Sequence, residues 1–173
     1  MIETERLKLI PFTREHYEAI LKNDNGSLGK LLGVETPGSW TEFKDAREAI
    51  PALISFFESL GDDLSWGSYF IILKKEHKLI GSCGFKGKPD FENYVEIGYE
   101  VHPQFQHRGI GSEAAKALVD FAFTKNIDGI KAHTLQEENN SVRILQRLGF
   151  TFQGKTEIMG EGPLWYWLLL KEK

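Results

Sequence analysis

Apolar and polar residues alternate in several short segments of the chain, which is the pattern of half-buried strands. In residues 6–12, for example, Leu7 and Leu9 fall on one face. Turn-rich connections such as residues 87–90 separate most of these segments. The predicted strands are residues 6–12, 68–74, 78–85, 93–101, 130–135, 150–158 and 164–170.

Other segments carry apolar residues at the spacing of a helix. Thr13 is a suitable N-cap for the first of them, Pro51 is expected to kink or divide the second, and Gly149 follows the last. Residues 26–40 are rich in glycine, and we expect an irregular loop there. The predicted helices are residues 13–22, residues 41–60, the segment from the glycines at 109 and 111 to about residue 125, and residues 141–148.

The order of these elements predicts a single domain over residues 1–173. We find no repeat, no low-complexity tract and no linker that would divide the chain. The fold class is α/β (α+β), with a mixed central sheet of six to seven strands and about four flanking helices.

Composition narrows the function classes. The net charge of −4 argues against a general nucleic-acid binder. With one cysteine, Cys83, the chain has no intramolecular disulfide, and no metal site is expected because the five histidines lack ligand spacing. The N-terminal residues are charged where a signal peptide is apolar, and the most apolar stretch, residues 164–170, is too short to cross a membrane. A cytoplasmic location without membrane partners is the default expectation.

The stretch QHRGIG at residues 106–111 carries the clearest chemistry. Two glycines beside a basic residue at a helix start predict an anion site, because the N–H groups there lack partners. The residues from Gly109 to Ala114 also match the G-x-G-x-x-A fingerprint of dinucleotide-binding folds. Two observations argue against such a fold: the residues before Gly109 are polar rather than a buried strand, and too few residues follow Gly111 for the remaining strands and helices. A P-loop lacks its Gly-Lys-Ser/Thr. A simple tight turn into the helix remains an alternative.

The same stretch resembles the Q/R-x-x-G-x-G/A signature of GNAT acetyltransferases. Other segments resemble the RimJ/RimL-type branch, whose members acetylate N-terminal alanine of ribosomal proteins, and they follow in that branch's order. They are residues 5–9 (ERLKL), 96–99 (EIGY) with 101–103 (VHP), 139–141 (NNS) with 148–150 (LGF), and 162–165 (GPLW).

The resemblance implies acetyl-CoA as cosubstrate, with its pyrophosphate on the signature loop. It also implies a sheet splayed in the middle, with the pantetheine arm between residues 93–101 and 130–135. Arg108 has an alternative interpretation as a solvated surface charge. The cofactor-binding residues implied are Tyr99, Val101, Gln106, His107, Arg108, Gly109, Ile110, Gly111, Ser112, Asn139 and Ser141.

One departure from the family pattern concerns the asparagine. Family members commonly place it three residues before the serine, where this chain has Glu138. Asn139 is the nearest substitute for that contact. Asn139 and Ser141 can equally be N-cap residues of the helix that follows. His102 and His107 lie on the cofactor loop, and both can instead be surface residues.

The implied catalytic residues are Glu96, Val101 and Ser141. Glu96 matches the family's strand glutamate that serves as general base, with a surface glutamate as the alternative, and Glu100 points to the same face. The Val101 N–H would stabilise the oxyanion. Ser141 and Tyr166 are the candidates for the general acid.

The sequence thus predicts an N-acetyltransferase that transfers an acetyl group directly to a primary amine in a ternary complex. The acceptor is a protein N-terminus or a small amine. The alternatives are a non-catalytic acyl-CoA sensor and a nucleotide-binding protein, and a homodimer is compatible with the sequence. The acceptor site is expected in residues 23–61, which hold Glu35, Trp40, Glu42 and Phe43, and in the turn at 159–164.

Overall fold

The computed structural model describes residues 1–22, 24–36, 55–158 and 160–172. One eight-stranded sheet forms its centre, in the order β1-β2-β3-β4-β5-β6-β8-β7. All seven predicted strands are present, and a two-residue strand at the N-terminus is the eighth. The strands are β1 (Ile2–Glu3), β2 (Leu7–Pro11), β3 (Ser68–Leu73), β4 (Lys78–Phe85), β5 (Tyr94–Val101), β6 (Gly129–Leu135), β7 (Thr151–Ile158) and β8 (Gly162–Leu170).

The helices α1 (Arg14–Leu21), α4 (Ile110–Thr124) and α5 (Asn140–Arg147) lie where the sequence predicts them. Residues 55–60 are helical and end at Gly61, whose φ is 61°. The expected start of that helix near residue 41, and Pro51, lie outside the described residues. Two short 3-10 turns, η1 (Leu64–Trp66) and η2 (Pro103–Phe105), complete the elements described.

The prediction of an irregular loop over residues 26–40 is wrong for the first half of that segment, where helix α2 (Asn25–Leu32) forms. The Asp24 carboxylate caps its start by accepting from the Ser27 N–H, and Leu28 buries completely in the core. Gly33, at φ 65°, ends the helix in the left-handed conformation. Cap signals and one deeply buried leucine therefore outweigh the low helix propensity of the glycines.

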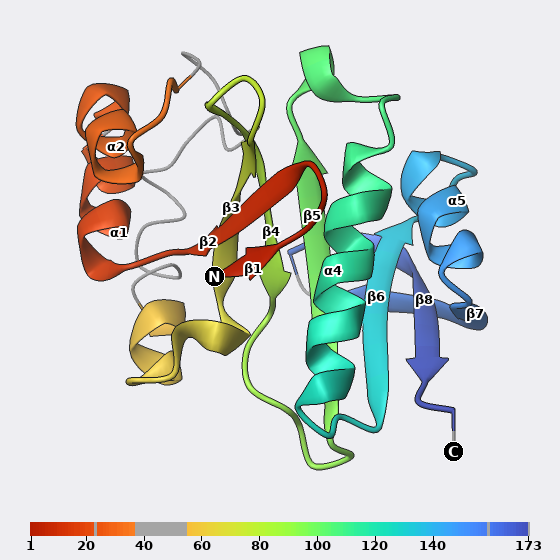
Figure 1. Cartoon of the computed structure of the whole chain (residues 1–173). Coiled ribbons are helices and arrows are strands. Elements are labelled where there is room, and N and C mark those ends of the chain that lie inside the picture. Colours follow the sequence, from red (N-terminus) through yellow and green to blue (C-terminus); the bar gives the residue numbers. More distant parts are fainter. Residues whose placement is uncertain (23, 37–54, 159, 173) are drawn as a thin grey trace.

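Two apolar clusters hold helices to opposite faces of the sheet (Figure 1). On one face α4 lies along β5 and β6, and its Leu118 belongs to the same buried cluster as Val95 and Ile97 of β5. On the other face α1 and α2 cover β3 and β4, where Phe70 and Leu79 are fully buried. The strand alternation assigns side chains to these faces, so even-numbered side chains of β5 point away from α4.

The sheet is splayed between β5 and β6. These parallel strands pair from Tyr94 opposite Gly129 to Glu96 opposite Lys131, yet β5 continues to Val101 and β6 to Leu135. Beyond Glu96, β5 remains paired with β4 and β6 with β8. A gap with strand backbone along its sides therefore opens in the middle of the sheet, as the family resemblance implies.

In the described part of the chain, no helix is long and apolar enough to span a membrane. The same residues contain no group of three or more histidine, cysteine, aspartate or glutamate side chains that could hold a metal ion.

Candidate active site

The β5 backbone presents hydrogen-bonding groups to the gap. Lys86 N–H donates to the Glu96 carbonyl, and His102 N–H donates to the Ile80 carbonyl, so the even-numbered peptide groups of this strand face β4. The alternation of an antiparallel ladder turns the odd-numbered groups, including those of Tyr99 and Val101, toward β6. Past the last β5–β6 pair these groups face the gap, where an extended ligand can pair with them.

The signature loop is joined to the end of β5 by a side chain. The Gln106 amide donates to the Val101 carbonyl at 2.8 Å. The loop then turns through His107 at φ 59° and Gly109 at φ 75°, and α4 begins at Ile110. Glycine adopts this left-handed conformation without steric strain because it has no Cβ, whereas other residues are strained in it. This turn explains the first signature glycine.

The start of α4 leaves N–H groups for a ligand. Its first intrahelical bond runs from the Glu113 N–H to the Gly109 carbonyl, so the preceding N–H groups have no acceptor within the helix. Gly111 keeps the approach open, because a Cβ there would lie 3.2 Å from Ile144 Cδ1 and 3.8 Å from Val101 Cγ2. The second glycine therefore serves close approach, and the site fits a phosphate group.

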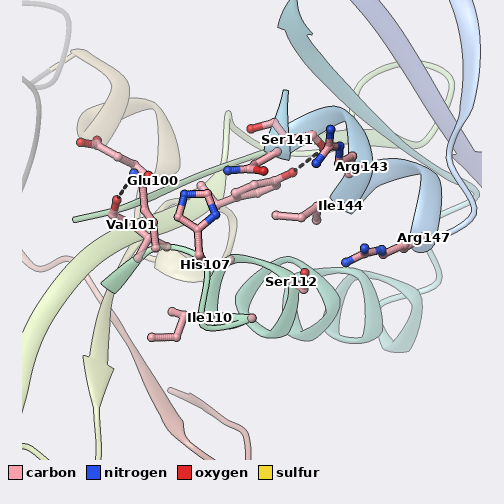
Figure 2. A pocket seen from close by; sticks show the side chains of 14 residues that line it. Glu100, Val101, His107, Ile110, Ser112, Ser141, Arg143, Ile144 and Arg147 are labelled. Atoms are coloured by element: carbon pink, nitrogen blue, oxygen red, sulfur yellow. Dashed lines mark hydrogen bonds between the residues drawn. The ribbon is translucent and has the colours of Figure 1, made fainter. Parts of the chain in front are cut away.

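These groups line a pocket of about 440 Å³ between β5, the start of α4 and α5 (Figure 2). Most of the cofactor-binding residues implied by the sequence meet here. They are Tyr99, Val101, Gln106, His107, Gly109, Ile110, Gly111, Ser112 and Ser141.

Three predicted site residues do not line this pocket. The Arg108 guanidinium lies 5.1 Å from the centre of the Phe105 ring and 3.9 Å from Glu76, with its side chain about half exposed. The Asn139 side chain accepts from the Val142 N–H at 3.1 Å, which is the N-cap arrangement of α5. Glu96 lies nearer the start of β5 than the pocket residues, where β5 and β6 are still paired.

Sequence reasoning missed two arginines of the pocket. Arg143 and Arg147 are one helical turn apart on α5, and Figure 2 shows them across from the first turn of α4. The sequence carried a signal for them: the two arginines are four residues apart in the helix predicted after Ser141, and this spacing places both guanidinium groups on one face of that helix. The pocket also includes Glu100, Asn140 and Ile144.

The N-terminal segment fastens the signature loop. Arg6 donates through Nη1 to the Arg108 carbonyl at 2.8 Å and through Nε to Glu113 Oε2 at 2.6 Å. Glu113 also accepts from the Arg6 N–H and the Thr4 hydroxyl. Burial opposes ionisation of Glu113, but these hydrogen bonds outweigh it and lower the pKa of the carboxyl. The first turn of α4 is thereby tied to the turn between β1 and β2.

Comparison with known proteins decides the family. Residues 6–151 match the acetyltransferase (GNAT) domain. The chain belongs to the GNAT acetyltransferase family. Its members use acetyl-CoA as cosubstrate, and the glycine loop and the splayed strands of this acetyltransferase are the features that suit that molecule.

Individual relatives agree with this assignment. This acetyltransferase is 29% identical over 157 residues to the uncharacterised N-acetyltransferase YjdG of Bacillus subtilis, covering 90% of this chain and 92% of that one. It is 30% identical over 153 residues to the uncharacterised N-acetyltransferase p20 of Bacillus licheniformis, covering 87% of this chain and 82% of that one. The GNAT domain and these relatives make the protein an N-acetyltransferase.

Solved structures share the fold. The ribosomal-protein-S5-alanine acetyltransferase of Vibrio fischeri superimposes with a TM-score of 0.67 at 20% identity, covering 97% of this chain and 94% of that one. The microcin C7 self-immunity acetyltransferase MccE, in complex with acetyl-CoA and AMP, gives a TM-score of 0.68 at 14% identity, covering 97% of this chain and 94% of that one.

A second polar group of this acetyltransferase lies on the sheet face opposite α4. Glu96 Oε1 is 2.9 Å from His133 Nδ1 and 2.7 Å from Lys86 Nζ. Burial disfavours the charged amine, but the Glu96 and Glu161 carboxylates raise the pKa of Lys86. Tyr166 stacks on the His133 ring with centroids 5.3 Å apart. The sequence-predicted base is therefore already engaged by two partners.

The two candidates for the general acid lie in different places. Ser141 lines the pocket, and its carbonyl accepts from the Tyr99 hydroxyl at 3.3 Å. Burial raises the pKa of Tyr99, which therefore stays a neutral donor. Tyr166 instead stacks on His133, outside the residues that line the pocket.

Of the residues expected at the acceptor site, Trp40, Glu42 and Phe43 lie outside the described part of the chain. Glu35 is described, and its carboxylate pairs with Lys78 Nζ at 3.3 Å at the start of β4. Its backbone also hydrogen-bonds the turn before that strand. Glu35 is thus fixed to the β3–β4 hairpin.

Proposed function

We propose that this acetyltransferase moves the acetyl group of acetyl-CoA to the α-amino group of a protein N-terminus by direct attack in a ternary complex. The observation that carries the transfer mechanism is the free edge of β5, which adjoins the glycine-rich start of α4 and extends past the last pair with β6. This edge offers one continuous path for phosphate, pantetheine and thioester.

The proposed binding mode follows that path. The pyrophosphate would lie against the first N–H groups of α4, with Arg143 and Arg147 supplying positive charge from α5. The pantetheine arm would pair with β5 as an extra strand does. The Val101 N–H, which the strand alternation turns to the gap, would stabilise the oxyanion of the thioester, and the Ser141 hydroxyl would protonate the departing thiolate.

Two observations support a cationic acceptor from the far side of the sheet. Glu96 and Glu100 share the β5 face that α4 does not cover. Gly98 lies between them, and nothing approaches within 4 Å of the position where its Cβ would be. The likeness over nearly the whole chain to a ribosomal-protein-alanine acetyltransferase favours a protein N-terminus, and with it the RimJ/RimL-type branch.

The test is a thiol-release assay with three acceptors: a peptide with N-terminal alanine, one with N-terminal serine, and spermidine. We expect CoA release with a peptide, and mass spectrometry should place the acetyl group on its α-amino nitrogen. The same peptide already acetylated at its N-terminus is the matched control and should give no release. Turnover of spermidine alone would reject the protein N-terminus in favour of a small amine.

A cytoplasmic location and a homodimeric state remain predictions of the sequence. Light scattering at two protein concentrations tests the dimer.

A further inference from the structure

We propose that His133 is the base that takes the proton from the acceptor amine, and that Glu96 is a positioning residue that holds the imidazole for this step. The inference deepens the proposed function and rests on it. It also reassigns the role that the family resemblance gives to Glu96.

The Glu96 carboxylate is poorly suited to accept a further proton. Its Oε1 already contacts Lys86 Nζ at 2.7 Å and His133 Nδ1 at 2.9 Å. Both contacts hold Oε1 as a hydrogen-bond acceptor, so this oxygen is not open to a proton from an entering ammonium group. A carboxylate with two such partners serves to orient them, in the same way that the third group of a nucleophile–base–carboxylate arrangement orients the base.

The same contact fixes the tautomer of His133. An ionised carboxylate can only accept a hydrogen bond, so Nδ1 must carry the proton that points to Glu96. The neutral ring then has its lone pair on Nε2, and among the described residues Nε2 has no hydrogen-bond partner. Tyr166 stacks on the ring with an interplanar angle of 24° and limits its rotation. Nε2 is thus a held and unoccupied proton acceptor.

The position of His133 suits an amine that enters the gap. His133 follows the last β5–β6 pair by two residues on β6, and continuing that register places it opposite Gly98. Gly98 has no side chain, and nothing lies within 4 Å of the place of its Cβ. The His133 side chain is 13% exposed, so it is enclosed yet reachable. Tyr166 stacks on its ring, and Lys131 lies two residues earlier on the same face of β6, paired with Asp90 and Glu92.

The acceptor enters as an ammonium ion and gives one proton to His133 Nε2. The neutral amine nitrogen bonds to the thioester carbonyl carbon, and the C–S bond breaks. The Ser141 hydroxyl protonates the thiolate, which leaves as CoA thiol, and Ser141 regains its proton from the second N–H of the amine, while the imidazolium returns its proton to solvent. No oxidant, reductant or metal is needed.

The decisive variant is His133→Asn. The asparagine amide nitrogen can still donate to Glu96 from the place of Nδ1, but the side chain has no counterpart of Nε2. A general base contributes about 10²–10⁴-fold, so we expect kcat at pH 7 to fall by about 10²-fold or more. The Kd of acetyl-CoA should stay within about twofold, since His133 does not line the cofactor pocket. His77→Asn, in the β3–β4 turn, is the matched control and should leave kcat unchanged.

The pH profile separates a base from a structural residue. With the most active of the three acceptors above, kcat of the unchanged enzyme should fall on the acid side, and His133→Asn should lose that acid limb. Glu96→Gln should keep the limb, displace it and lower kcat by about tenfold. A His133→Asn profile of unchanged shape would overturn the inference. No CoA release from the unchanged enzyme with any acceptor would overturn the proposed function itself.

Discussion

The cofactor pocket and the polar group around Glu96 are built in opposite ways. The pocket consists mainly of backbone, namely the free edge of β5 and the first N–H groups of α4, which side chains from other elements hold in place. The group around Glu96 consists of side chains from separate elements, Glu96 on β5, His133 on β6 and Tyr166 on β8, with Lys86 just after β4. Binding of a constant cosubstrate needs a fixed backbone, whereas proton transfer needs side chains at chosen positions.

The comparison predicts that the two regions can be impaired independently. Changes in the pocket should raise the Kd of acetyl-CoA, and changes around Glu96 should alter kcat and its pH dependence at nearly constant Kd. Any variant that moves both quantities strongly would contradict this division.

The largest expected effect is the loss of acetyl-CoA binding in Gly111→Val. Even a single Cβ at this position would lie 3.2 Å from Ile144 Cδ1, and the branched side chain of valine would fill the space between α4 and β5. We expect calorimetry to give a Kd at least ~100-fold higher, which corresponds to roughly 2.7 kcal/mol. The protein should stay folded by circular dichroism.

A matched control for this variant exists in α2. Gly26 is the second residue of that helix, as Gly111 is of α4, so Gly26→Val has a comparable propensity cost. Its Cβ would meet the Asp24 side chain at 3.4 Å and nothing in the pocket. Acetyl-CoA affinity should be unchanged. Equal losses in both variants would show that the Gly111 effect is one of helix stability.

The next largest effect concerns Arg6, which fastens the loop from outside the pocket. Arg6→Ala removes the bonds to the Arg108 carbonyl and to Glu113. We expect the Kd of acetyl-CoA to rise by about tenfold and the free energy of unfolding to fall by about 1–2 kcal/mol. Lys116→Ala removes an exposed ion pair with Asp120 from the same helix and is the control, with no change in Kd.

Acid should weaken the same fastening. The pKa of Glu113 is lowered in the folded protein, so its stabilisation is complete above the unfolded value, about 4.3, and is lost as pH falls through the folded value. Between about pH 5 and 3 the unchanged protein should therefore lose more free energy of unfolding than Glu113→Gln. Parallel curves of stability against pH would remove Glu113 from this role.

The same contrast explains which features the sequence predicts. The β5 alternation, the glycines at 109 and 111 and the helix that follows are local patterns, and the predicted strands and that helix are confirmed. Helix α2 was missed because its stability comes from the Asp24 cap and the burial of Leu28, while its glycines suggest a loop. Local propensity gives way there to tertiary packing.

The group around Glu96 was beyond sequence reasoning for a different reason. Glu96 and His133 are far apart in the chain and meet only because β5 and β6 are adjacent parallel strands. Lys86 and Tyr166 are brought to them by β4 and β8 in the same way. The register of a parallel pair depends on the helix between the strands, so a pattern of single residues cannot supply it.

A smaller effect is expected from the arginines of α5. Arg143→Ala and Arg147→Ala should each raise the Kd of acetyl-CoA by about threefold to tenfold, because each removes a cation that lines the pocket on one side. The affinity should also become less sensitive to salt, since screening acts on these charges. Lys125→Ala, at the far end of α4, is the control and should leave both quantities unchanged.

The smallest effect sharpens the other side of the comparison. Lys86→Met removes the cation that competes with His133 for the Glu96 carboxylate. With that cation gone, the Glu96 carboxylate interacts with the imidazolium alone, so the acid limb of kcat should move to higher pH. The Kd of acetyl-CoA should not change, and neither quantity should change in Lys88→Met, two residues along the same loop. An acid limb that stays in place or moves to lower pH in Lys86→Met would contradict this coupling, because loss of a neighbouring cation favours the protonated form of the titrating group.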